Sequence, residues 1–157
     1  MKKSMYAFAL VAAMTLAPAV SNAKTVNVTV NLKQYNGYPA FLAVYLTDAQ
    51  GHYKETIHLA GFPLGYFGHL RHWLRESRGQ VPNLDSITGA SVGPGQTLQF
   101  SADIADALLN AGYQIHIDDA SEWMMEVPND AVVSLDAQNA GKPVPGKTYI
   151  QDMSFTM

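Results

Sequence analysis

The chain has 157 residues, with 10 Lys plus Arg, 13 Asp plus Glu and no cysteine. The lack of cysteine excludes disulfides, iron–sulfur clusters, c-type haem attachment and thiol redox chemistry. A formal net charge of −3 disfavours a nucleic-acid role, because binding to phosphates needs a basic surface.

The first 23 residues have the pattern of a secretory signal peptide. Lys2 and Lys3 precede an apolar run over residues 5–20, and Ser21 and Ala23 place small side chains where a signal peptidase reads. The run is short for a membrane span, and Pro18 interrupts it. We therefore expect cleavage after Ala23, a periplasmic location, and one domain over residues 24–157 that does not span a membrane.

Most of the remaining chain has the spacing of β-strands. Apolar and polar residues alternate over 25–32, and a turn at 48–51 separates apolar runs at 41–47 and 53–60. Four more strands are predicted at 97–102, 113–117, 131–135 and 148–156. About seven short strands joined by Gly and Pro turns predict a mostly β fold, an immunoglobulin-like antiparallel β-sandwich.

Two segments interrupt the strand pattern and predict short helical insertions. Residues 66–78 have helical spacing, and Gly79 follows as a stop signal. Residues 103–110 predict a second helix with Asp103 as its N-cap. A Gly- and Pro-rich stretch at 141–146 predicts a turn into the last strand.

The segment Asp85-Ser86-Ile87-Thr88-Gly89-Ala90-Ser91, here called the acceptor segment, resembles the acceptor site of proteins that carry a covalent flavin. Their motif runs Asp, two variable positions, Ser or Thr, Gly, Ala, then Thr or Ser. The resemblance implies that an FAD:protein FMN transferase joins FMN to the Ser91 hydroxyl as a phosphoester. It also makes Asp85, Thr88, Gly89 and Ala90 part of the cofactor attachment site.

The residue types in the acceptor segment suit such a role on chemical grounds. A hydroxyl that enters another enzyme's active site needs a slim, mobile, exposed approach, which Gly89 and Ala90 are expected to supply. Asp85 could bind a metal or the hydroxyl in the transferase complex. Gly and Pro at 93–95 predict an exposed loop after Ser91. The alternative is an ordinary turn, because Asp-Ser and Thr-Gly are common turn sequences.

A second resemblance covers the chain from about residue 25 to 157 and is to an exported family known as domain of unknown function 2271. It rests on residues 43–46 with the turn at Gly51, and on segments 69–75, 85–91 and 141–149. The resemblance implies a target of the flavin transferase that accompanies membrane redox proteins with PepSY domains. Ser91 departs from the family pattern, where Thr is commoner.

The predicted helix at 66–78 is the candidate surrounding of the flavin. Arg71, Arg75 and Arg78 are spaced to share a helix face and could meet the FMN phosphate or acidic partners. Aromatic rings that could stack on the flavin are those of Tyr66, Phe67 and Trp73. The alternatives are a core position for Trp73 and a solvated face for the arginines.

Metal and hydrolase chemistry find little support in the sequence. His69 and His72 could clip a metal, but no third ligand follows from the spacing, so surface histidines are the alternative. The run at 123–126, Trp-Met-Met-Glu, could suit Cu(I) through its thioethers or could simply pack. The chain has no Gly-x-Ser-x-Gly elbow and no His-Glu-x-x-His. We therefore predict no catalytic residues and no metal site.

Together these observations predict a periplasmic flavoprotein that carries FMN on Ser91 and passes electrons between a membrane redox partner and an extracytosolic acceptor, the flavin supplying the chemistry. It would be an electron-transfer protein and a transferase substrate rather than an independent enzyme. The alternative is a cofactor-free immunoglobulin-like module that binds a ligand, a metal or a membrane protein.

Overall fold

Strand β1 (Ala23–Leu32) realises the first alternating segment, with Val26, Val28 and Val30 buried and their polar neighbours facing out. The computed structural model describes residues 22–61, 64–80 and 86–157, with the side chains of 64–66 left out. The proposed signal peptide core, at 1–21, lies outside the described residues. Within the described residues no helix is both long and apolar enough to cross a membrane.

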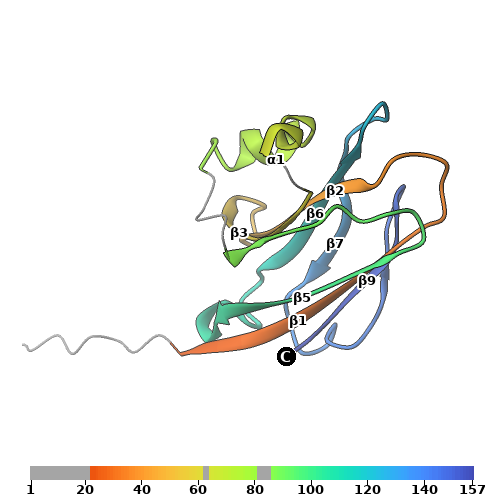
Figure 1. Cartoon of the computed structure of the whole chain (residues 1–157). Coiled ribbons are helices and arrows are strands. Elements are labelled where there is room, and N and C mark those ends of the chain that lie inside the picture. The colour runs from red at the N-terminus through yellow and green to blue at the C-terminus, as the bar shows by residue number, and fades with distance from the viewer. Residues whose placement is uncertain (1–21, 62–63, 81–85) are drawn as a thin grey trace, which may run out of the picture.

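The strands form two sheets that pack face to face (Figure 1). Sheet A has the order β5-β1-β9-β8, with β5 (Thr97–Ala105), β8 (Val144–Pro145) and β9 (Ile150–Thr156). Sheet B has the order β4-β3-β2-β6-β7, with β2 (Ala40–Thr47), β3 (Tyr53–Ala60), β4 (Thr88–Gly89), β6 (Gln114–Ser121) and β7 (Val127–Ser134). The predicted β-sandwich is confirmed.

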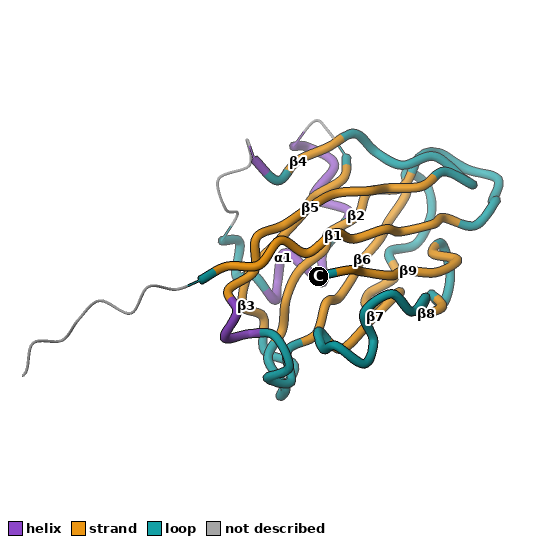
Figure 2. Tube along the Cα trace, turned by 90° about the horizontal axis from the view of Figure 1, so that it is seen from below, coloured by secondary structure: helices purple, strands orange, loops and turns teal. Residues whose placement is uncertain are grey.

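The pairing departs from a purely antiparallel sandwich at one edge. Among the described strands, β4 pairs with β3 in parallel, whereas the other pairs are antiparallel. Loops lie at the ends of the strands, as Figure 2 shows in teal. The predicted hairpin at 48–51 is confirmed, because the backbone N–H of Gln50 and of His52 donate to the Asp48 carboxylate and Gly51 adopts φ +83°.

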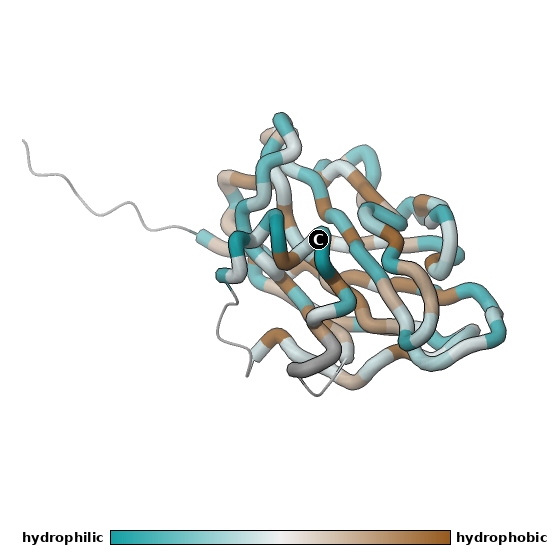
Figure 3. The backbone as a smooth tube through the Cα atoms, turned by 90° about the horizontal axis from the view of Figure 1, so that it is seen from above, coloured by the Kyte–Doolittle hydropathy of each residue, from teal (hydrophilic) through white to brown (hydrophobic). Residues whose placement is uncertain are grey.

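Sheet B is covered on both faces, which explains why every residue of β2 is buried. One side chain set faces the core between the sheets and includes Leu42 and Val44. The intervening side chains, such as Phe41 and Tyr45, face a second apolar cluster beneath the helical segment. Because both of its faces are covered, β2 is a nearly continuous apolar run. Along several other strands, hydrophobic and hydrophilic residues alternate (Figure 3).

The predicted helix at 66–78 is shorter and is broken into two pieces. A 3-10 helix, η1 (Leu64–His69), is followed by α1 (Arg71–Glu76). Gly68 lowers the helix propensity of the first piece, and Arg78 at φ +54° ends the second. Trp73 is fully buried and its indole N–H donates to Thr56 Oγ1 at 2.8 Å, so its alternative reading as a core residue is confirmed.

The predicted helix at 103–110 is wrong. Strand β5 continues to Ala105, and only a short 3-10 turn, η3 (Asp106–Leu108), follows. Asp103 is no N-cap, since it lies opposite Thr25 in β1 and accepts a hydrogen bond from the Thr25 hydroxyl at 2.7 Å. Pairing with β1 outweighs the local helix preference, because it satisfies the backbone groups across the strand.

Candidate functional site

The acceptor segment is tied to the edge of sheet B rather than hanging free. The Ile87 carbonyl accepts the N–H of Leu59 at 2.8 Å, and the Gly89 carbonyl accepts the N–H of Gly61 at 2.9 Å. Thr88 and Gly89 therefore form the parallel strand β4 and are partly buried. Asp85 lies outside the described residues.

Ser91 sits between this edge strand and a second anchor. Ala90 is exposed and Ser91 is partly exposed, whereas Val92 is buried and exchanges two backbone hydrogen bonds with Ala40, at 2.7 and 3.0 Å. Val92 belongs to the core between the sheets. Ser91 itself lies just outside a strand, between β4 and the bridge that Val92 makes with Ala40.

The loop after Ser91 is less exposed than its composition predicts. Gly93 and Pro94 are partly buried, and only Gly95 is exposed. Gly93 donates its N–H to the Gln96 side chain at 3.0 Å, and Gly95 donates to the Lys33 carbonyl at 3.0 Å. These bonds hold the backbone beyond Ser91 in place.

Gly89 has a packing reason that the sequence does not reveal. A Cβ at this position would lie 3.3 Å from His58 Nε2, closer than ordinary contact. His58 stacks on Phe100, with ring centroids 4.2 Å apart and planes 11° from parallel, and its buried Nε2 has no hydrogen-bond partner. Burial lowers the pKa of His58 to about 4. The imidazole beneath the acceptor segment is therefore neutral at physiological pH.

A hollow of about 380 Å³ opens on the α1 side of sheet B. We call it the Trp123 hollow; its lining residues are His69, Arg71, Trp123, Met124, Met125 and Glu126. One wall is the junction of η1 and α1, and the other is the β6–β7 turn. Two of its side chains project into solvent, since Trp123 is 90% exposed and Met125 is 83% exposed.

A polar cleft of about 270 Å³ lies under α1. Two of its lining residues bind the buried Asp118 carboxylate, which accepts hydrogen bonds from Tyr45 Oη at 3.0 Å and from the Asn129 N–H at 2.8 Å. His72 Nδ1 lies 2.7 Å from Asp118 Oδ2. Burial and the neighbouring Asp118 raise the pKa of Tyr45 far above its ordinary value, which keeps the phenol a donor. Sequence spacing alone gives no signal for Asp118.

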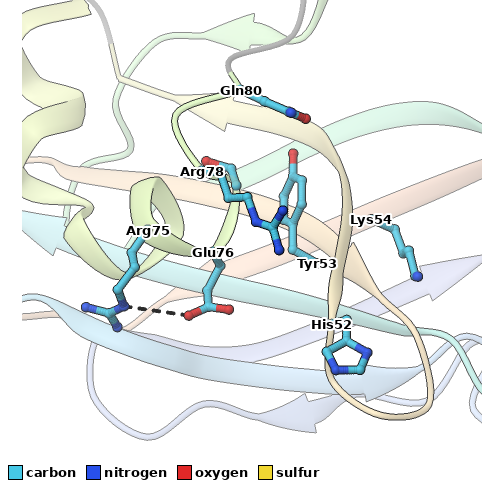
Figure 4. Close-up of a pocket in the computed structure, with 8 residues that line it drawn as sticks. His52, Tyr53, Lys54, Arg75, Glu76, Arg78 and Gln80 are labelled. Atoms are coloured by element: carbon cyan, nitrogen blue, oxygen red, sulfur yellow. Dashed lines mark ion pairs between the residues drawn. The ribbon is translucent and has the colours of Figure 1, made fainter.

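The arginine stripe predicted from spacing is divided between two places. Arg71 lines the Trp123 hollow, whereas Arg75 and Arg78 line a separate basic pocket of about 400 Å³, shown in Figure 4. That pocket also contains His52, Tyr53, Lys54, Glu76, Ser77 and Gln80. Arg75 Nε lies 3.7 Å from Glu76 Oε1, marked by the dashed line in Figure 4.

The basic pocket and the acceptor segment lie at opposite ends of β3. Tyr53 at the start of β3 lines the pocket, and Ala60 at its end pairs with Gly89. A strand rises about 3.4 Å per residue, so these ends are about 24 Å apart. Arg75 and Arg78 therefore line a pocket at the end of β3 away from Gly89, and their meeting with a flavin phosphate or with acidic partners stays a prediction.

The aromatic and histidine side chains of the predicted helix at 66–78 also lie in different places. Phe67 and Trp73 are buried in the cluster beneath η1 and α1 and offer no exposed ring, and the Tyr66 side chain lies outside the described residues. His72 binds Asp118, whereas His69 stacks on Phe41 with centroids 5.8 Å apart. Among the described residues no three His, Asp or Glu side chains converge as a metal site.

Comparisons with known proteins agree with the exported character of the chain. A family model described as a predicted periplasmic protein (DUF2271) matches residues 23–152. No curated protein and no solved structure matches the chain.

Proposed function

Because the chain belongs to the DUF2271 family of predicted periplasmic proteins, we propose that it is a periplasmic electron carrier with FMN attached to Ser91. The observation that carries this proposal is the order of residue types from Asp85 to Ser91. The placement of Gly89, Ala90 and Ser91 at a sheet edge supports it, since a transferase can approach an edge without unfolding the domain.

The described residues fit a flavin attachment site. Ala90 is exposed and carries only a methyl group, and Gly89 has no side chain. These two residues therefore put little bulk between the Ser91 hydroxyl and an approaching transferase. Backbone bonds at Gly89 and Val92 hold the acceptor from both sides. A hydroxyl held this way loses little conformational freedom on entering another active site.

The attachment is a phosphoryl-group transfer. Ser91 Oγ attacks the phosphorus on the riboflavin side of the FAD pyrophosphate, the bond from that phosphorus to the bridging oxygen breaks, and AMP leaves with this oxygen. The hydroxyl proton passes to a base of the transferase. The products are AMP and a serine phosphoester of FMN, so the protein gains the mass of FMN less one water.

The proposed partners follow from the family resemblance and the compartment. A membrane redox protein of the PepSY type would be one electron-transfer partner, and an extracytosolic protein or small molecule would be the other. The flavin supplies two-electron and one-electron chemistry, while this chain supplies placement and tuning. Covalent attachment suits a compartment where free FMN would be diluted, because a tether keeps the cofactor at high local concentration.

A cofactor-free interaction module is the second candidate. The exposed Trp123 and Met125 favour it, because exposed apolar groups gathered in one place mark interaction sites. The two candidates differ at the Ser91 hydroxyl.

Intact mass tests the proposal. We expect the exported chain, produced together with an FAD:protein FMN transferase, to gain FMN less one water. Ser91→Ala should fold and stay unlabelled, and Ser91→Thr should be labelled. Ser101→Ala removes an exposed hydroxyl from β5 and should be labelled like the wild type. An unmodified wild type beside a labelled known substrate would refute the flavin carrier and leave the interaction module.

A further inference from the structure

We propose that the Trp123 hollow receives the isoalloxazine ring of the FMN carried on Ser91, with Trp123 and Met125 lying against the ring. This inference rests on the proposed function and adds the place where the cofactor lies. It assigns a ligand-binding role to the β6–β7 turn, which the acceptor motif does not include.

The conformation of Trp123 is the first reason. Its φ is +64° and its side chain is 90% exposed. A bulky side chain in the left-handed region is an outlier, whereas Gly and Asn adopt this backbone conformation at little cost. The exposed indole gives the fold almost no buried area in return, and such uncompensated strain concentrates at functional sites.

Distance is the second reason. Val92, next to Ser91, bridges Ala40, and Ala40 pairs on its other side with Ser121, two residues before Trp123. Adjacent strands lie about 4.8 Å apart, so the backbone at Ser121 is about 10 Å from that at Val92. A ribityl phosphate spans about eight bonds, roughly 10 Å at the reach of an extended chain. The tether length therefore matches the distance from the backbone beside Ser91 to the start of the β6–β7 turn, which forms one wall of the hollow.

The position of the hollow over sheet B agrees with this distance. His69, which lines the hollow, stacks on Phe41. Phe41 follows Ala40 in β2. A tether from Ser91 thus crosses β2 over Phe41 and His69 without passing through the core.

The lining has the chemistry that a flavin ring prefers. Trp123 offers a flat aromatic face, and the thioethers of Met124 and Met125 are polarizable and adapt their shape. A hollow of about 380 Å³ is within the usual range for small-molecule sites. Arg71 at the rim can place positive charge beside the reduced, anionic ring.

A Trp123→Gly variant tests binding of the flavin ring in the Trp123 hollow separately from attachment of FMN to Ser91. Gly removes the indole ring and adopts the positive φ without strain. With the fully labelled protein, we expect the wild-type flavin emission to be quenched and its anisotropy high. Trp123→Gly should raise the emission several-fold and lower the anisotropy, and its thermal midpoint should equal or exceed that of the wild type. Trp123→Asn, which also tolerates positive φ, should behave like Trp123→Gly.

Two controls and the mass spectrum make the outcome decisive. Trp123→Phe keeps a flat ring and should preserve the anisotropy, and Lys142→Ala, exposed beyond the opposite end of β7, should match the wild type in every readout. If Trp123→Gly is fully labelled and has the same emission and anisotropy as the wild type, the flavin ring does not bind in the Trp123 hollow. The β6–β7 turn would then be a surface for a partner protein. A chain that is never labelled would refute the flavin carrier itself.

Discussion

At the scale of single residues, His58 links the acceptor segment to the core. It stacks on Phe100 of β5 in the opposite sheet, and its Nε2 lies where a Cβ on Gly89 would press. The nitrogen has no partner and is shielded from water. An imidazole in this position stays neutral in the folded protein because a charge there could not be solvated.

We predict that His58 makes the protein less stable in mild acid. Burial lowers its pKa to about 4 in the folded state, whereas the unfolded value is about 6.5. The unfolded chain therefore takes up a proton first, and stability falls as the pH drops from about 6.5 towards 4. His58→Phe should remove part of this loss in thermal unfolding measured at pH 7 and pH 5.

His116 contributes to the same loss, because burial also lowers its pKa. The wild type and His58→Phe should unfold with more similar midpoints at pH 5 than at pH 7 if Phe is the less stable side chain at neutral pH. An equal pH dependence in the two proteins would show that the pKa of His58 is the same in the folded and unfolded states.

At the scale of elements, α1 depends on the sheet beneath it. Six residues are too few for a helix to be stable alone. Three hydrogen bonds fasten it: Trp73 Nε1 to Thr56 Oγ1 at 2.8 Å, His72 Nδ1 to Asp118 Oδ2 at 2.7 Å, and the His72 N–H to Glu126 Oε1 at 2.6 Å. The last bond joins α1 to the β6–β7 turn, and so fixes the width of the Trp123 hollow.

We predict that His72→Ala destabilises the protein by about 2 kcal/mol, since it removes a charge-assisted donor from a fully buried carboxylate. The side chain is only 19% exposed, so water replaces it poorly. His52→Ala is the matched control, because this histidine is 74% exposed beside Asp48 and should cost less than about 1 kcal/mol. Urea unfolding midpoints of equal size for the two variants would contradict the role of Asp118 as an anchor.

At the scale of the whole molecule, two neighbouring carboxyl groups join β6 and β7 to the turn before β9. Asp130 accepts backbone N–H groups from four successive residues, 147–150, at 2.5 to 2.9 Å. Burial alone would raise its pKa, but the hydrogen bond from Asp119 and these N–H donors lower it overall. Asp119 is fully buried, and as a carboxylate neither of its oxygens would have a donor.

Asp119 is therefore protonated, so that it can donate to Asp130. Burial, reinforced by Asp130 and Asp118, raises its pKa to about 10. The unfolded value is near 4, so between these values the folded state holds the extra proton, and stability falls as the pH rises. The window from pH 7 to 9 is free of the two histidines, whose pKa values lie lower.

We predict that the thermal midpoint of the wild type falls from pH 7 to pH 9 and that Asp119→Asn flattens this fall, because an amide keeps a donor without titrating. Asp152→Asn changes a carboxylate that is only partly buried on β9 and should leave the slope unchanged. A wild-type midpoint that is constant across this window would show that Asp119 is ionised in the folded protein.

The sequence by itself determined the β-sandwich, because strand periodicity reports which face of each strand is buried. Seven predicted strands correspond to β1, β2, β3, β5, β6, β7 and β9 within a few residues. It also determined the exported character and the acceptor-like order ending at Ser91. These features are local in the chain, so neighbouring residues are sufficient to reveal them.

Tertiary structure alone decided what surrounds the acceptor. Asp103, predicted to begin a helix, lies in a strand because it pairs with β1. Arg71 and Arg75, both on the short α1, line different pockets. The parallel pairing of β4 with β3 places Gly89 over His58, and the bridge between Ala40 and Val92 holds the chain beyond Ser91 against β2. The physical reason is that these contacts join residues about 20 apart in the sequence or more, and no local preference encodes which distant partner a strand edge meets.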